Sequence, residues 1–136
     1  MTPEKFANLV SLRRVRDQID ANYAQALDVA AMASMAAMSS AHFSRSFRAS
    51  YGEAPYFYLQ TRRIERAKAL LRKGESVTDT CLAVGYLSFG SFSTLFRTLV
   101  GESPSKYRQR DNREVEALPT CVKMMATRPR HSSTSL

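Results

Sequence analysis

The sequence predicts an all-α fold in which two helix-turn-helix subdomains are joined by a long connecting helix. Three observations predict it. Apolar residues recur at helical spacing, and nowhere do they alternate as they would in a strand. A segment of 16 residues occurs twice, 49 positions apart. Each copy belongs to a pair of short helical patterns separated by a tight turn, which is typical of a helix-turn-helix motif.

The repeat is the most informative of these features. Residues 43–58 align without gaps on residues 92–107, and eight of the 16 positions are identical. The identical pairs are Phe43/Phe92, Ser44/Ser93, Phe47/Phe96, Arg48/Arg97, Gly52/Gly101, Glu53/Glu102, Pro55/Pro104 and Tyr58/Tyr107. Chance does not produce such agreement, so the chain contains the same supersecondary unit twice.

The first subdomain is expected over about residues 27–52. A helix over residues 10–21 is expected to precede it and to pack on it. The first helix of the subdomain is rich in alanine and covers about residues 27–37. After a short break, Ser39 or Ser40 can cap the second helix by accepting a backbone N–H.

The connecting helix is expected over about residues 55–73, since a proline suits its first turn and a glycine follows its last residue. The second subdomain follows over about residues 76–101 and begins with a helix over residues 77–84. Together these segments form one expected DNA-binding domain, residues 1–110. Residues 111–136 are expected to be a flexible tail.

The second helix of each subdomain has an outward face without an acidic residue in either copy. At about 100° per residue, the aromatic stripe of each helix faces inward, and small, polar and basic residues face outward. Such a face suits the major groove of DNA, because small residues allow close approach and arginine pairs with guanine. The alternative is an ordinary solvated face, although such faces usually mix acidic with basic residues.

Several motifs resemble the AraC/XylS-like family of transcription regulators, over roughly residues 12–110. They include residues 42–48 (His-Phe-Ser-Arg-Ser-Phe-Arg), and the most specific are residues 91–96 (Ser-Phe-Ser-Thr-Leu-Phe) and 101–108 (Gly-Glu-Ser-Pro-Ser-Lys-Tyr-Arg). The resemblance implies about seven helices. It also implies base-reading positions, which we assign to Ser40, Ala41, Ser44, Arg45, Phe89, Gly90, Ser93 and Thr94. We expect phosphate contacts from His42, Arg48, Arg63 and Arg97.

The sequence departs from the family in the first turn, where glycine is usual and Ala37 stands here. If the backbone is left-handed at this position, alanine costs about 1 kcal/mol. Many family members also carry a sensor domain, and no such domain fits into the residues before Leu27. The chain is therefore expected to be a stand-alone member.

The charge balance fits this interpretation without deciding it. With 20 Lys and Arg against 12 Asp and Glu, the net charge is +8, spread along the chain, and a polyanionic partner is favoured. We expect a sequence-specific, double-stranded DNA-binding transcription regulator that inserts two recognition helices into successive major grooves as a monomer. RNA polymerase is a second expected partner, and the bacterial cytoplasm at the nucleoid is the expected location.

Other classes of function are less well supported. One alternative stays open: a protein-interaction module that binds RNA polymerase or another regulator and does not read DNA itself. The sequence shows no catalytic pair, phosphate-binding loop or metal-ligand cluster, so we expect no enzyme, no cofactor and no metal. It has no apolar run of 18 residues, so we expect no membrane partner.

Overall fold

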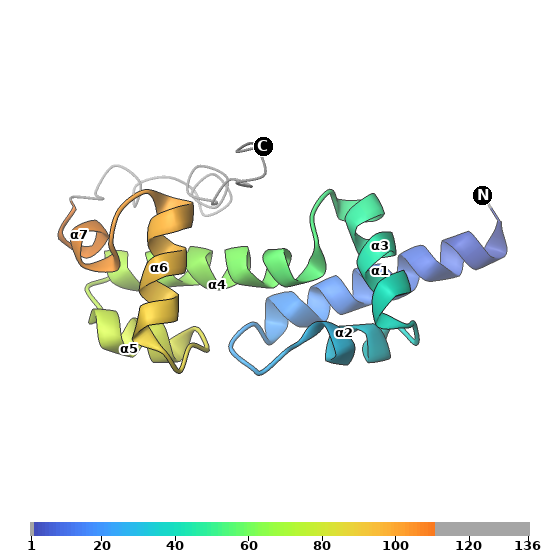
Figure 1. Cartoon of the computed structure of the whole chain (residues 1–136), viewed down its shortest axis with the longest axis horizontal. Coiled ribbons are helices and arrows are strands. Elements are labelled where there is room, and N and C mark those ends of the chain that lie inside the picture. The colour runs from blue at the N-terminus through green and yellow to red at the C-terminus, as the bar shows by residue number, and fades with distance from the viewer. Residues whose placement is uncertain (1, 111–136) are drawn as a thin grey trace. The chain divides into compact units, whose positions relative to one another are not determined.

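The computed structural model describes residues 2–110, which form seven α-helices and, within that range, no strand (Figure 1). The helices are α1 (Pro3–Ala21), α2 (Val29–Met35), α3 (Ser40–Tyr51), α4 (Pro55–Arg72), α5 (Val77–Ala83), α6 (Phe89–Val100) and α7 (Pro104–Gln109). The all-α class and the number of helices are thus confirmed. The expected flexible tail, residues 111–136, lies outside the described residues.

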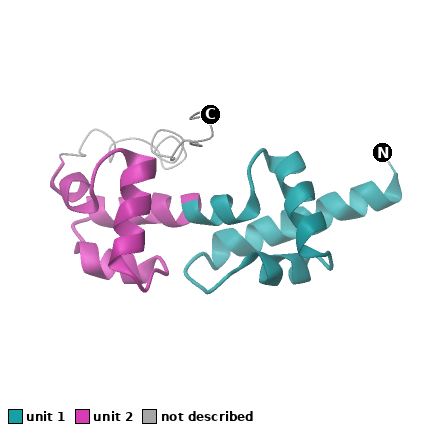
Figure 2. Ribbon diagram, in the orientation of Figure 1, with its two compact units in different colours: residues 1–60 teal, residues 61–136 magenta. Residues whose placement is uncertain are grey.

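The chain divides into two compact units, residues 1–60 and 61–136, and the division falls within α4 (Figure 2). The first unit contains α1, α2, α3 and the start of α4. The second contains the rest of α4 with α5, α6 and α7. Each unit therefore holds one expected helix-turn-helix pair, which is α2 with α3 or α5 with α6.

Helix α1 begins seven residues before the expected start at Val10, so that boundary was wrong. Its first turns bury no side chain, since its buried residues are Leu12, Val15 and Ile19. Apolar periodicity therefore could not reveal them. Local signals did exist, because Thr2 Oγ1 accepts the backbone N–H of Lys5 at 3.1 Å and a proline occupies the first turn.

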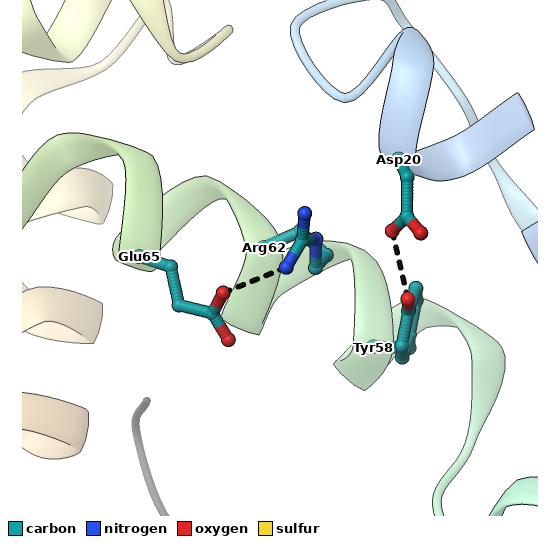
Figure 3. Close-up of polar contacts among 4 residues, drawn as sticks. All are labelled: Asp20, Tyr58, Arg62 and Glu65. Carbon is teal, nitrogen blue, oxygen red and sulfur yellow. Dashed lines mark hydrogen bonds and ion pairs between the residues drawn. The ribbon is translucent and has the colours of Figure 1, made fainter. Parts of the chain in front are cut away.

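In the first unit, α3 packs on both α1 and α2 (Figure 1). Phe43 and Phe47 of α3 are completely buried beside Met32 of α2. The start of α4 closes this core, because Tyr58 packs its ring edge on Phe47 at 5.7 Å between centroids. The Tyr58 hydroxyl donates to the Asp20 carboxylate of α1 at 2.7 Å (Figure 3). One tyrosine thus ties three helices together.

The second unit repeats this packing with its own residues. Phe92 and Phe96 of α6 are completely buried, and α6 packs on α5 and α7. The ring centroids of Phe92 and Phe96 lie 5.8 Å apart, and those of Phe43 and Phe47 lie 5.7 Å apart. Tyr107 of α7 meets Phe96 edge-on at 5.6 Å, as Tyr58 meets Phe47. The sequence repeat is therefore also a repeat of core geometry.

Candidate nucleic-acid interface

Helices α3 and α6 begin and end in the same way. Ser39 Oγ accepts the backbone N–H of His42 at 3.2 Å, and Ser88 Oγ accepts that of Ser91 at 3.3 Å. Both helices contain 12 residues and stop at a left-handed glycine. Of the two caps considered from the sequence, Ser39 is the one formed, and Ser40 is the first helical residue. Both helices therefore present a well-defined N-terminus, where the partial positive charge favours anions.

The residues assigned to base reading lie on the solvent side of these two helices. None of them is buried. Six are exposed, namely Ser40, Ala41, Arg45, Phe89, Gly90 and Thr94. The other two, Ser44 and Ser93, are half-buried and flank the same faces. The structure thus leaves two corresponding surfaces of the repeat open to a partner.

Three arginines on these helices stay available. Arg45, Arg48 and Arg97 are exposed, and within residues 2–110 none of their guanidinium groups forms a hydrogen bond or an ion pair. The outward-facing His42 is exposed as well. Because α3 and α6 contain no acidic residue, nothing on their own faces competes for these cations.

Several other arginines of residues 2–110 are engaged with the protein itself. Arg16 stacks over the Tyr51 ring at 4.6 Å, and Arg72 donates to the Tyr107 hydroxyl at 2.9 Å. Arg62 pairs with Glu65 at 2.8 Å along α4 (Figure 3). These are structural cations, whereas Arg13, Arg14 and Arg66 are exposed and form no hydrogen bond or ion pair within residues 2–110, as is true of the three arginines on α3 and α6.

Arg63 is one of the structural cations, which argues against the phosphate contact that we expected of it. Only 7% of the residue is exposed. Its guanidinium lies over the Tyr86 ring, 5.3 Å from the centroid, in the interior of the second unit. The aromatic ring of Tyr86, in the turn between α5 and α6, holds this arginine inside. We assign it a packing role.

The two turns differ by one residue, which sequence reasoning missed. Ala37 and Gly85 occupy equivalent places, each one residue after the helix cap, with φ of 56° and 96°. From there to the serine cap of the next helix, the first turn has Met38 alone, whereas the second has Tyr86 and Leu87. The extra leucine is 97% exposed. Extending the repeat alignment through the turns would have revealed this insertion.

Two further observations bear on the class of protein. Among the described helices, none is both long and apolar enough to cross a membrane. Over the same residues, no cluster of His, Cys, Asp or Glu could hold a metal ion. Cys81 is buried, its thiol donates to the backbone carbonyl of Tyr86 at 3.7 Å, and burial raises its pKa.

Comparison with known proteins identifies the repeated unit. Residues 32–110 match the family described as "Helix-turn-helix domain". The DNA-binding domain of AdpA, solved in complex with a target DNA, superposes with a TM-score of 0.73 at 29% identity, over 79% of this chain and 98% of that one. A probable AraC family transcriptional regulator from Rhodopseudomonas palustris gives 0.66 at 27% identity, over 74% and 95%. The chain belongs to the AraC-type helix-turn-helix family.

Two matching proteins of known sequence are transcription regulators by name. An uncharacterized HTH-type transcriptional regulator of Staphylococcus aureus is 31% identical over 106 residues, which is 77% of this chain. AdaA of Bacillus subtilis, a bifunctional transcriptional activator and DNA repair enzyme, is 27% identical over 83% of this chain. The chain spans 14% of the length of the first protein and 54% of the second. The comparison therefore covers a helix-turn-helix part of longer proteins.

Proposed function

We propose that this AraC-type chain is a transcription regulator that binds double-stranded DNA at a specific sequence and places α3 and α6 in major grooves. The observation that carries the proposal is the pair of equivalent, acid-free helix faces with available arginines. The structure of AdpA with its target DNA supports it at 29% identity. In this proposal Ser40, Ala41, Ser44 and Arg45 read bases from α3, and Phe89, Gly90, Ser93 and Thr94 read them from α6.

Phosphate contacts fall to the cations at the borders of the two faces. His42 and Arg48 on α3, and Arg97 on α6, are exposed and suitably placed for this role. Contacts to phosphate fix the register of the protein, while contacts to base edges carry the sequence preference. We therefore expect Arg45 to govern specificity and Arg48 and Arg97 to govern overall affinity.

We also propose that one copy of the chain occupies two successive major grooves. Helix α4 has 18 residues and would run about 27 Å at 1.5 Å per residue. Two half-sites on one side of the duplex are about 34 Å apart. A connecting helix of this length, which follows α3 and precedes α6 in the sequence, suits that spacing. In a bacterial cell such a protein would act at the nucleoid in the cytoplasm, without catalytic activity of its own, and would contact RNA polymerase at a promoter.

Enrichment of bound fragments from random double-stranded DNA tests the proposal. We expect one motif with two conserved segments about one helical turn apart. The stoichiometry of the selected complex, measured by analytical ultracentrifugation, should be one chain per duplex. A protein that enriches no motif would refute sequence-specific binding, and two chains per duplex would refute the monomer arrangement.

The alternative of a protein-interaction module predicts a different outcome. Such a chain would bind RNA polymerase or another regulator equally well with and without added DNA. Its affinity would also change little with salt, whereas binding to phosphates weakens steeply as salt rises. A salt titration of both complexes therefore separates the two functions.

A further inference from the structure

We infer that the second unit recognises thymine methyl groups through an apolar pair, Leu87 and Phe89, at the start of α6. The inference rests on the proposed binding of DNA by α3 and α6, and it goes further by assigning different chemistry to the two helices. Helix α3 would read polar base edges through Arg45, and α6 would read methyl groups.

The exposure of the pair is the first observation. Leu87 is 97% exposed and Phe89 is 50% exposed. A single exposed apolar side chain needs no explanation. These two, however, stand two positions apart on either side of the α6 cap, Ser88. They place apolar surface where the helix would enter a groove.

The corresponding positions of the first unit are polar or small. Phe89 and Thr94 of α6 correspond to Ser40 and Arg45 of α3, because the two helices align at an offset of 49 residues. Leu87 has no counterpart, since it is the extra residue of the second turn. The apolar character is therefore specific to α6 and does not come from the shared fold.

Phe89 is also positioned by a contact with the core. The centroid of the Phe89 ring lies 6.5 Å from that of the buried Phe92 ring, so the Phe89 side chain packs against the core. The next residue, Gly90, leaves open space, because a Cβ there would meet only Ser88 Oγ, at 3.8 Å. The backbone of α6 can thus come close to a surface beside the phenylalanine ring.

The chemistry of the major groove indicates what such a surface can recognise. Leu87, Phe89 and Gly90 offer no side-chain donor or acceptor to a base edge. Thymine is the only common base that presents a methyl group in the major groove, and apolar side chains contact that group. We therefore expect thymine to be preferred at one or two positions in the half-site of α6.

Replacing thymine by uracil tests this on the protein's own selected site. The substitution removes only the 5-methyl group and keeps the base pair and its other groove atoms. We expect uracil to weaken binding about fourfold at each contacted position, the fold-change that corresponds to one buried methyl group. Uracil elsewhere in the site should have no effect, and 5-methylcytosine in place of cytosine at a contacted position should recover part of the methyl contribution.

Protein variants assign the effect to the two residues. In the variants Phe89→Ala and Leu87→Ala, replacing thymine by uracil at a contacted position should reduce the affinity less than it does for the wild type. The reason is that the side chain that contacts the methyl group has been removed. Two matched controls carry the same changes at other exposed sites. They are Phe6→Ala on α1, where the residue is 61% exposed, and Leu82→Ala on α5, where it is 58% exposed. Both controls should keep the full sensitivity to uracil. All four side chains are exposed, and circular dichroism will verify that each variant folds.

The possible failures are distinguishable. If the wild-type chain selects a motif but tolerates uracil at every position, DNA binding stands and the methyl assignment is wrong. If Phe89→Ala and Leu87→Ala bind as tightly as wild type, the assignment is wrong too, and this surface serves a protein partner. If the wild-type chain selects no motif, both the proposed function and this inference are refuted.

Discussion

Ala37→Gly is expected to stabilise the first unit. Ala37 has φ of 56° in the turn between α2 and α3, and it is the only non-glycine residue with positive φ among residues 2–110. The left-handed region brings Cβ close to the backbone, which costs an L-residue about 1–2 kcal/mol. Gly85 stands at the equivalent place in the second unit. The sequence predicted strain at this alanine if the backbone were left-handed, and the backbone is left-handed here.

The net gain is smaller than the strain. Glycine also makes the unfolded chain more flexible, which lowers the free energy of unfolding by about 0.4–1 kcal/mol. Ala37 is exposed, so removal of its Cβ loses almost no buried surface. We therefore expect the free energy of unfolding to rise by about 0.5–1 kcal/mol, which for a unit of this size raises the melting temperature by roughly 2–8 °C.

Urea unfolding followed by circular dichroism measures this change, and hydrogen exchange of the α2 and α3 amides shows whether it belongs to the first unit. Ala49→Gly is the matched control, since Ala49 is exposed within α3. There the same substitution should destabilise by about 1 kcal/mol, because glycine is unfavourable inside a helix. If Ala37→Gly destabilises the protein as much as Ala49→Gly does, the strain argument is wrong.

Four more predictions concern single side chains. Arg45→Ala should cost about 1–3 kcal/mol on the selected site and relax one base position, whereas Arg97→Ala should weaken all sequences alike and lower the salt slope by about one, both measured by band-shift titration. Burial, and after it the charge of Arg72, lowers the pKa of Lys68 from 10.5 to about 8. Because the unfolded chain then holds more protons between these two pKa values, the contribution of Lys68 to stability should rise with pH from about 8 to 10.5. The stability advantage of Lys68→Met over wild type should accordingly shrink across that window in urea unfolding, by roughly 1–2 kcal/mol after screening by solvent; an advantage that does not change with pH would contradict the assigned pKa. Thr80 is 1% exposed, and its hydroxyl finds no hydrogen-bond partner among the described residues, so Thr80→Val should stabilise by about 1 kcal/mol, whereas exposed Thr78→Val should not.

The core could be predicted from the sequence, because it depends on short-range spacing. Phe43 with Phe47, and Phe92 with Phe96, recur at four-residue intervals, and all four are buried as the helical period requires. The ends of α3 and α6 also reflect local chemistry, since a serine caps the start of each helix and a left-handed glycine caps its end. These signals act within a few residues and need no knowledge of the tertiary fold.

The failures arose where the deciding partner is distant or absent. Arg63 was expected to contact phosphate, yet Tyr86, 23 positions away, fixes it in the interior. The start of α1 had no buried side chain to mark it, and only the cap at Thr2 and the proline of the first turn reveal it. The charge and the apolar spacing of one segment do not show which aromatic ring of another segment packs against it.

The repeat itself explains why the reading residues are harder to derive than the core. The two copies bury equivalent aromatic rings, as in the pairs Phe47–Tyr58 and Phe96–Tyr107, so these core positions are each supported by a counterpart. Solvent positions are under no such constraint, and there Arg45 and Thr94 differ although their helices match. The second turn even accommodates Leu87 without changing the packing of Phe92 on Phe96. Differences between equivalent exposed positions therefore mark where the two units have separate tasks, and a DNA site that is read by both should be asymmetric.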